Sequence, residues 1–308
     1  MVASRNEKNT LANAPGKMFL FGEHSVLYGH PAIVVPIKRY VSVESFFSKD
    51  LHGVRVLPKE SAHASAAARA FLKWNRCTQR NGIILQTRSD IPFPGLGSSS
   101  ATIVATIRSL SILFEKKLSD RAVYSIAKKA KTIAEGNAGS YADVACSTYG
   151  KLILYENPTR IKRLPAKGPE KISFIAASTP REKTTAEMIF KAGLLSGKAC
   201  GRLPVIDCMG IITRDACSCI RKGKWGEVGR LMLDYHSMLS FAGVNTPLLS
   251  RTVAHAVSLG ALGAKTSGAG GGDCAIILAR RHNENELLNG MNRDGIRTLG
   301  FGLERGGD

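Results

Sequence analysis

The order of apolar and polar residues along the chain predicts alternating strands and helices. Short apolar runs are typical of strands, and four of them lie in the first half of the chain: 17–22, 32–45, 83–87 and 151–155. Apolar residues also recur at helical spacing in two segments: Ile103, Ile107, Leu110 and Phe114, then Val123, Ile126, Ala130 and Ile133. Ser119 has the residue type and the position of a cap for the second of these helices.

The alternation continues in the second half, after a polar run with prolines and a glycine at 156–171 that is typical of a domain boundary. The pattern predicts strands at 172–178 and 274–279, a helix from near Thr185, helices across 205–240, and a helix with Pro247 in its first turn. We therefore expect an α/β fold of two domains, residues 1–165 and 166–308.

Composition narrows the class of protein. No apolar run reaches the roughly 18–20 residues of a membrane helix, and the N-terminal residues lack the apolar core of a secretory signal, which predicts a cytoplasmic protein without a membrane segment. Seven scattered cysteines are typical of reduced thiols rather than of a metal site. The net charge of +19 favours an anionic partner: a nucleic acid, an acidic surface or a phosphorylated small molecule. No nucleic-acid-binding motif accompanies the charge, so nucleic acid is disfavoured, and a homodimer is compatible with the sequence.

The stretch "PFPGLGSSSA" at 92–101 stands directly before a predicted apolar helix. Backbone N–H groups in the first turn of a helix have no partner inside the helix, and the helix dipole attracts negative charge there. Glycines let this backbone approach a ligand closely, so the stretch predicts a phosphate-binding loop. It differs from a Walker loop because the Gly-Lys-Ser/Thr ending is absent. The alternative is an ordinary helix capped by serine after a glycine turn.

Two further stretches combine glycine with polar residues. "GAKTSGAGGGDCAIIL" at 263–278 carries five glycines beside a predicted strand, and "APGKMFLFGEHSVLYGHPAI" at 14–33 carries Lys17, Glu23 and His24 at the ends of a strand. Taken singly, the first is also compatible with a structural glycine turn and the second with ordinary turn residues.

Together and in this order, the three stretches resemble the GHMP kinases. The resemblance covers nearly the whole chain, and it implies an N-terminal domain like one in ribosomal protein S5 followed by a ferredoxin-like C-terminal domain. It also implies ATP and Mg²⁺ as cofactors and a kinase of the isoprenoid-forming mevalonate pathway.

Different parts of the chain resemble different branches of this family. "LFGEHSVLYGHPAI" at 20–33 is most similar to the mevalonate kinases, whereas 139–155 and "KTSGAGGGDC" at 265–274 resemble the phosphomevalonate kinases. We expect a phosphorylated mevalonate as acceptor, either the 5-phosphate accepting on its phosphate or the 3-phosphate accepting on its 5-hydroxyl. Mevalonate itself is the alternative, and a non-catalytic regulator or nucleic-acid binder with the same fold is a more distant one.

The resemblance also implies roles for individual residues. The phosphates of ATP would lie on Pro94, Gly95, Leu96, Gly97, Ser98, Ser99 and Ser100, and Ser99 would be a ligand of Mg²⁺ unless the register shifts by one. Asp143 would face the acceptor, with Lys17 nearby holding it ionised and lowering the pKa of an acceptor hydroxyl. The acceptor would contact Glu23, His24, Lys183, Thr185, Gly268 and Ala269, and Arg181 is a further candidate for an anionic acceptor group. A structural histidine is the alternative for His24.

The glutamate that is the family's second magnesium ligand is not found at the matching position of this chain, so the carboxylate that would bind magnesium stays open. Mevalonate kinases carry a glutamate ahead of the catalytic aspartate, and counting back from Asp143 by that spacing leads to Thr132. Glu135 is near but out of register, so we expect it to be an exposed residue at the end of a helix.

Overall fold

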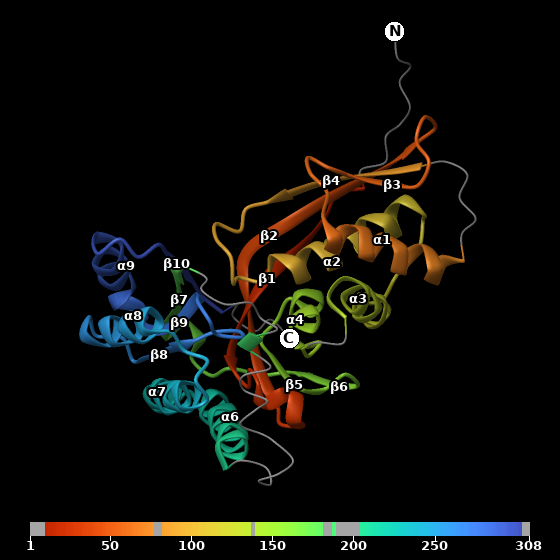
Figure 1. Cartoon of the computed structure of the whole chain (residues 1–308). Coiled ribbons are helices and arrows are strands. Elements are labelled where there is room, and N and C mark those ends of the chain that lie inside the picture. The colour runs from red at the N-terminus through yellow and green to blue at the C-terminus, as the bar shows by residue number, and fades with distance from the viewer. Residues whose placement is uncertain (1–9, 77–81, 137–138, 181–186, 189–203, 304–308) are drawn as a thin grey trace. The chain divides into compact units, whose positions relative to one another are not determined.

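The computed structural model describes residues 10–76, 82–136, 139–180, 187–188 and 204–303. The chain divides into two compact units (Figure 1). The first unit comprises residues 1–16, 39–91 and 98–149, and the second comprises 17–38, 92–97 and 150–308. Strands β1 (Ala12–Phe21) and β2 (Ala32–Ser48), which pair with each other, contribute residues to both units. These units are defined by contacts and each combines several segments of the chain, so they do not test the predicted domain boundary at 165/166, which stays a prediction.

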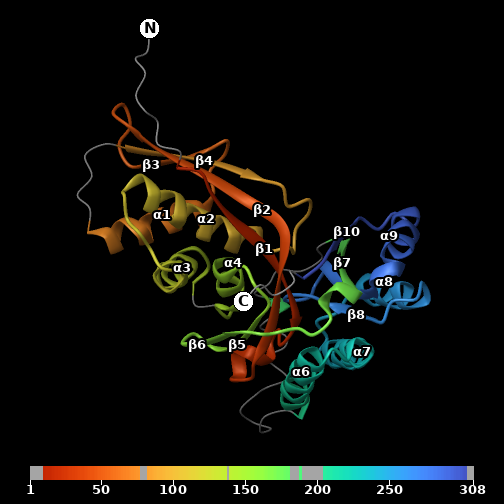
Figure 2. The same ribbon diagram turned by 180° about the vertical axis from the view of Figure 1, so that it is seen from behind.

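The first unit is a layer of strands covered by helices. Residues 41–48 of β2 pair antiparallel with β4 (Gly82–Ser89), and β3 (Val54–Leu57) pairs parallel with β4. Helices α1 (Ala62–Asn75) and α2 (Ser98–Leu113) lie along one face of these strands (Figures 1 and 2). The hydroxyl of Ser109 on α2 donates to the hydroxyl of Ser45 on β2, at 2.8 Å, which marks the covered face.

Helices α3 (Asp120–Glu135) and α4 (Ala142–Tyr149) pack on α1 and α2. The Ser119 hydroxyl accepts a hydrogen bond from Ala122 N–H, which confirms the predicted cap. The helical spacing is confirmed for Val123, Ile126 and Ala130, which are buried. Ile133 also lies in α3, as predicted, but it is 47% exposed, whereas Lys131 is buried on the same helix.

The second unit contains a four-stranded antiparallel sheet. Its strands are β7 (Ile172–Thr179), β8 (Gly263–Thr266), β9 (Asp273–Arg280) and β10 (Thr298–Phe301), in the order β10-β7-β9-β8. The helices are α6 (Pro204–Lys222), α7 (Trp225–Phe241), α8 (Pro247–Ser258) and α9 (Glu284–Arg293). Thr246 caps α8 and Pro247 opens it, as predicted. A strand–helix–strand–strand–helix–strand order with antiparallel pairing is the ferredoxin-like arrangement expected for this half of the chain.

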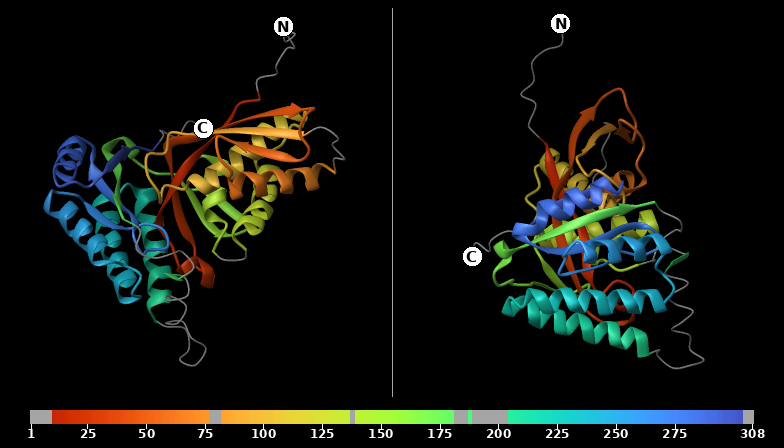
Figure 3. Two further views of the ribbon diagram at one scale, coloured as in Figure 1. Left: turned by 45° about the horizontal axis from the view of Figure 1, so that its top comes forward. Right: turned by 90° about the vertical axis from the view of Figure 1, so that its left-hand side faces the viewer.

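The two faces of this sheet are covered by different helices. Alternate residues such as Ile175 and Ile277 face α8 and α9, which lie side by side against the sheet (Figure 3). On the other face, the Phe174 ring meets the Trp225 ring of α7 edge to face, with the centroids 6.4 Å apart. The sheet is therefore buried on both sides, which explains the nearly continuous apolar run of β9.

The remaining elements of the second unit are short. Residues 32–34 of β2 pair antiparallel with β5 (Ile153–Asn157), and β5 pairs with β6 (Arg160–Arg163). Three 3₁₀ turns are η1 (Ser25–Tyr28), η2 (Pro169–Lys171) and η3 (Arg281–Asn283). The polar run 156–171 thus contains a strand and a turn. The helix expected from near Thr185 begins outside the described residues.

Helix α7 packs directly on the strand β8 through two glycines. A Cβ added at Gly229 would lie 2.1 Å from the carbonyl oxygen of Leu262, and one added at Gly263 would lie 2.0 Å from the carbonyl oxygen of Gly229. Gly226, one turn earlier on the same helix, has no atom within 4 Å of such a Cβ.

We expect Gly229→Ala and Gly226→Ala to change stability in opposite directions. The first overpacks the contact with β8 and should lower the free energy of unfolding by about 1–3 kcal/mol. The second adds helix propensity in open space within the first turn of α7 and should raise it slightly, by at most about 0.5 kcal/mol. Urea unfolding of both variants measures this, and equal effects would contradict the packing.

Candidate active site

The predicted phosphate-binding loop is tightly packed in the second unit. Gly95 and Gly97 have φ angles of 87° and 78°, in the left-handed region that favours glycine. A Cβ at Gly95 would lie 2.7 Å from Cys274 Sγ, and one at Gly97 would lie 2.9 Å from Lys17 Cγ. Lys17 N–H donates to the carbonyl oxygen of Leu96 at 2.8 Å, so β1 and β9 hold the loop. The glycines are required by backbone conformation and by space.

Two side chains that sequence reasoning missed hold the start of this loop. The Arg297 guanidinium donates to the carbonyl oxygen of Pro92 at 2.7 Å and lies 5.6 Å from the centroid of the Phe93 ring. The Cys274 thiol lies 3.1 Å from the carbonyl oxygen of Pro94 and donates to it. Helix α2 begins at Ser98, directly after the loop, as predicted. In its first turn Ser98 is exposed, Ser99 is half-buried and Ser100 is buried.

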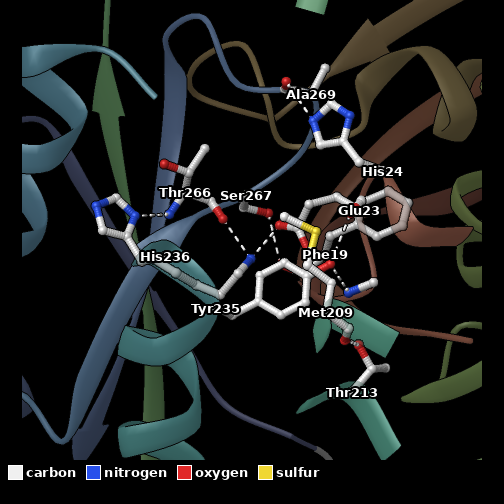
Figure 4. Close-up of polar contacts among 12 residues, drawn as sticks. Phe19, Glu23, His24, Met209, Thr213, Tyr235, His236, Thr266, Ser267 and Ala269 are labelled. Atoms are coloured by element: carbon white, nitrogen blue, oxygen red, sulfur yellow. Dashed lines mark hydrogen bonds and ion pairs between the residues drawn. The ribbon is translucent and has the colours of Figure 1, made fainter. Parts of the chain in front are cut away.

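Glu23, at the end of β1, forms a buried ion pair with Lys265 of β8 (Figure 4). The side chains are 3% and 0% exposed, and the Lys265 ammonium also donates to the carbonyl oxygen of Thr266 at 2.5 Å. Burial raises the pKa of Glu23, although the Lys265 charge and the Gly268 backbone oppose the shift. Burial likewise lowers the pKa of Lys265 against the Glu23 charge. Both groups are thus displaced toward their neutral forms, and the pair carries no net charge.

Tyr235 of α7 holds the backbone beside this pair. Its hydroxyl donates to the carbonyl oxygen of Glu23 at 2.8 Å and accepts from Gly22 N–H at 3.1 Å (Figure 4). Its ring lies 5.1 Å from the Lys265 ammonium. Burial raises the pKa of Tyr235 well above its usual value, so the hydroxyl keeps its proton and remains a donor. The helix therefore fixes the turn that carries Glu23 and His24.

His24 meets the glycine loop between β8 and β9. Its Nε2 lies 2.9 Å from the carbonyl oxygen of Ala269, next to Gly268, and a carbonyl only accepts, so Nε2 carries the proton (Figure 4). Burial lowers the pKa of His24 to about 4, opposed by the Ala269 hydrogen bond and assisted by the Lys265 charge. The ring is therefore neutral at pH 7, and its Nδ1 is a hydrogen-bond acceptor. His24 and Ala269, both predicted to contact the acceptor, meet in the structure.

Asp143 lies in the first unit, in the first turn of α4. Its Oδ2 forms an ion pair with Lys131 of α3, and its Oδ1 accepts from Val144 N–H at 2.8 Å. Lys17, its predicted neighbour, belongs to the second unit, where its ammonium lies 5.0 Å from the centroid of the Phe19 ring. The structure thus pairs Asp143 with a lysine that sequence reasoning did not select.

Comparison with known proteins gives the chain a family. The model of the GHMP kinases N terminal domain matches residues 62–151, and that of the GHMP kinases C terminal matches residues 216–297. A mevalonate kinase of Pyrococcus furiosus is 32% identical over 301 residues, covering 87% of this chain and 89% of the relative. One of Archaeoglobus fulgidus is 31% identical, covering 87% and 92%. The chain belongs to the GHMP kinase family.

Solved structures agree on the fold of this GHMP kinase. The mevalonate kinase of Methanococcus jannaschii superimposes with a TM-score of 0.83 at 24% identity, covering 98% of this chain and all of that one. A phosphomevalonate kinase of Streptococcus pneumoniae, in complex with phosphomevalonate and AMPPNP, gives 0.81 at 19% identity and covers 95% and 99%. Family and relatives identify the chain as an ATP-dependent small-molecule kinase in the mevalonate-kinase branch, with the two-domain GHMP fold.

Several predicted positions need separate comment. Lys183 and Thr185, together with Arg181, lie outside the described residues. Asp273 has a φ of 72°, a backbone conformation that favours glycine and that other residues rarely adopt. Glu135 is exposed at the end of α3, as predicted, and its carboxylate lies 3.0 Å from Nε2 of His63.

The parts of this kinase that the structure describes contain no helix long and apolar enough to cross a membrane. Within the same ranges, no three side chains of His, Cys, Asp or Glu gather in a way that could hold a metal ion. Ser99, which is half-buried, carries a hydroxyl oxygen of the type that Mg²⁺ accepts.

The shifted pKa of His24 predicts a pH dependence of stability. The unfolded chain takes up a proton below pH 6.5, whereas folded His24 does so only near pH 4, so folding loses free energy as the pH falls through this window. The loss between pH 7 and pH 4 should be about 3 kcal/mol. Between pH 7 and pH 4, the free energy of unfolding of His24→Gln should therefore fall by about 3 kcal/mol less than that of the wild type. Urea unfolding at both pH values measures this. Parallel pH curves for the two proteins would contradict the assignment.

Proposed function

We propose that the chain transfers the γ-phosphoryl group of ATP to a hydroxyl of mevalonate. Support comes first from the relatives, which are mevalonate kinases at about 30% identity over most of both chains. The carrying observation is the acceptor-side cluster of the second unit. Its cation and anion, Lys265 and Glu23, neutralise each other, and His24 is neutral. Such a cluster offers hydrogen bonds rather than net positive charge, which suits a hydroxy acid better than a phosphate ester.

Each group in the proposal has one role. The backbone from Pro94 to Ser100 binds the phosphates of ATP, because a helix N-terminus behind a glycine loop attracts anions. Lys17 adds a positive charge at this loop, and Asp143 accepts the proton of the acceptor hydroxyl as its oxygen bonds to the γ-phosphorus and ADP departs. Mg²⁺, held through Ser99 and the nucleotide, would offset the negative charge on the transferred group.

The acceptor contacts complete the proposal. The Nδ1 of His24 accepts a hydrogen bond from a hydroxyl of the acceptor, while Glu23 and the backbone at Gly268 and Ala269 line the same side. Lys183 and Thr185 remain proposed contacts on sequence grounds. A phosphorylated mevalonate is the second candidate acceptor. Residues 139–155 and Asp273, which resemble the phosphomevalonate kinases, favour it.

One assay separates these acceptors. The purified chain with ATP and Mg²⁺ is offered mevalonate, mevalonate 5-phosphate and mevalonate 3-phosphate, and ADP release is followed for each. We expect the highest kcat/KM with mevalonate. A higher kcat/KM with mevalonate 5-phosphate or mevalonate 3-phosphate would instead support a phosphorylated mevalonate as the acceptor. Absence of ADP release with all three compounds would refute the proposal.

The substitution Asp143→Asn tests the role of the carboxylate. A hydroxyl acceptor must lose a proton, so we expect kcat to fall by about 10²–10⁴-fold. An acceptor phosphate is already ionised, and the loss would then be small. Asp215→Asn is the matched control, because Asp215 is exposed on α6 and should change kcat by less than about twofold. A mutant that keeps full activity with mevalonate would show that Asp143 is not the base.

A further inference from the structure

Lys131 is a buried cation whose donors are all directed at the protein. The side chain is 7% exposed, and a buried ammonium is unfavourable unless it is paired and hydrogen-bonded. It contacts the Asp143 carboxylate, donates to the carbonyl oxygen of Ser140 at 2.9 Å, and lies 3.7 Å from Oε2 of Glu135. The Asp143 carboxylate and the Ser140 carbonyl accept hydrogen bonds, and Glu135 adds an ion pair beyond hydrogen-bonding distance. These contacts of Lys131 are all with the protein itself.

The contacts of Lys131 keep it charged. Burial disfavours the ammonium, but the charges of Asp143 and Glu135 outweigh burial and raise its pKa. The ammonium in turn stabilises the carboxylate form of its partner. Asp143 is held from the other side as well, because Val144 N–H bonds its Oδ1 and the first turn of α4 favours negative charge. The same contacts therefore fix the orientation of the Asp143 carboxylate and favour its ionised form.

Other charged groups near α4 differ in position. Glu135, on α3, shares Lys131 with Asp143 and also pairs with His63 of α1. Arg108, on α2, reaches the opposite end of α4, where it donates to the carbonyl oxygen of Thr148 at 2.6 Å and pairs with Asp120. Of these charges, Lys131 contacts Asp143 and opposes its protonation, and Glu135 competes for Lys131.

We propose that Lys131 is a positioning residue that keeps the Asp143 carboxylate ionised and oriented in mildly acidic solution, so that this ion pair sets the acid limit of the kinase. The inference rests on the proposed role of Asp143. It predicts a specific signature: substitutions at Lys131 and at Glu135 should shift the acid limit in opposite directions.

The test compares kcat/KM against pH for the wild-type chain and three variants. Lys131→Met keeps the length of the side chain and removes the charge, so the acid limb should move to higher pH by about 1–3 units. Glu135→Gln frees Lys131 for Asp143, so its limb should move to lower pH, by a few tenths of a unit because Glu135 is about one-third exposed. Lys129→Met removes an exposed charge of the same helix and should leave the limb in place.

A second measurement needs no activity. Aspartate labelled with ¹³C at the carboxyl carbon gives a resonance for Asp143, assigned by its absence in Asp143→Asn. Its titration midpoint should shift upward in Lys131→Met and slightly downward in Glu135→Gln. Because Glu135 is partly exposed, the second variant keeps the test decisive even if Lys131→Met does not fold.

Failure of the proposed kinase function and failure of the proposed role of Lys131 would give different results. A wild-type chain without ATP-dependent turnover would remove the proposed function, and the carboxyl titration would still decide the role of Lys131. The proposal would be overturned if Lys131→Met and Glu135→Gln lost only unfolding free energy, with the Asp143 titration midpoint and the acid limb of kcat/KM unchanged. The Lys131–Asp143 pair would then only join α3 to α4.

Discussion

The loop at 92–97 lies so close to β1 and β9 that glycine is required at its points of contact. The backbone of this loop lies against Lys17 and Cys274 so closely that a Cβ at either glycine would overlap them. The same device recurs where Gly229 meets β8, and where Gly270 approaches the carbonyl oxygen of Val244. Glycine is unfavourable in most positions because it loses the most conformational entropy on folding. Its clustering here reflects contacts between backbone segments that no side chain could allow.

The second recurring feature is the carboxylate that meets a buried lysine. Glu23 and Lys265 lie within the second unit, both almost fully buried, and burial displaces both toward neutrality. Lys131 and Asp143 lie within the first unit, less completely enclosed, and there the charges prevail over burial. The contrast suits different tasks. A pair displaced toward its neutral forms beside His24 would suit hydrogen bonding to the proposed acceptor, whereas a pair that stays ionised would suit the proposed role of Asp143 as a base.

Sequence reasoning predicted features that are local in the chain. The start of α2 after the glycine loop, the cap at Ser119 and the proline that opens α8 depend on neighbouring residues, and the structure contains each of them. Phosphate binding by that loop stays a prediction. Ile133 lies in α3 as predicted but is exposed, because periodicity identifies a helix face and not what covers each turn of it. The short strand β6 was missed because polar residues with proline are typical of a linker.

The partners of the site residues could not be predicted in the same way. Lys265 lies 242 residues from Glu23, and Tyr235 lies 212 residues from it. Lys131 is only 12 residues from Asp143, but its pairing requires knowing how α3 packs on α4. The sequence did contain one signal for this pair: Lys131 lies on the buried face of a predicted helix, and a buried lysine must be paired. Arg297 offered none, since an arginine before an edge strand is ordinary.

We propose that the glycine loop binds the phosphates of ATP, and calorimetric titration measures this binding. A non-hydrolysable ATP analogue is titrated with Mg²⁺ into the wild-type chain, into Gly97→Ala, and into Gly226→Ala as a matched glycine substitution far along the sequence. We expect saturable heat for the wild type and for Gly226→Ala, with affinity reduced at least ~tenfold in Gly97→Ala, where the new Cβ meets Lys17. No heat with the wild-type chain, or undiminished affinity in Gly97→Ala, would contradict it.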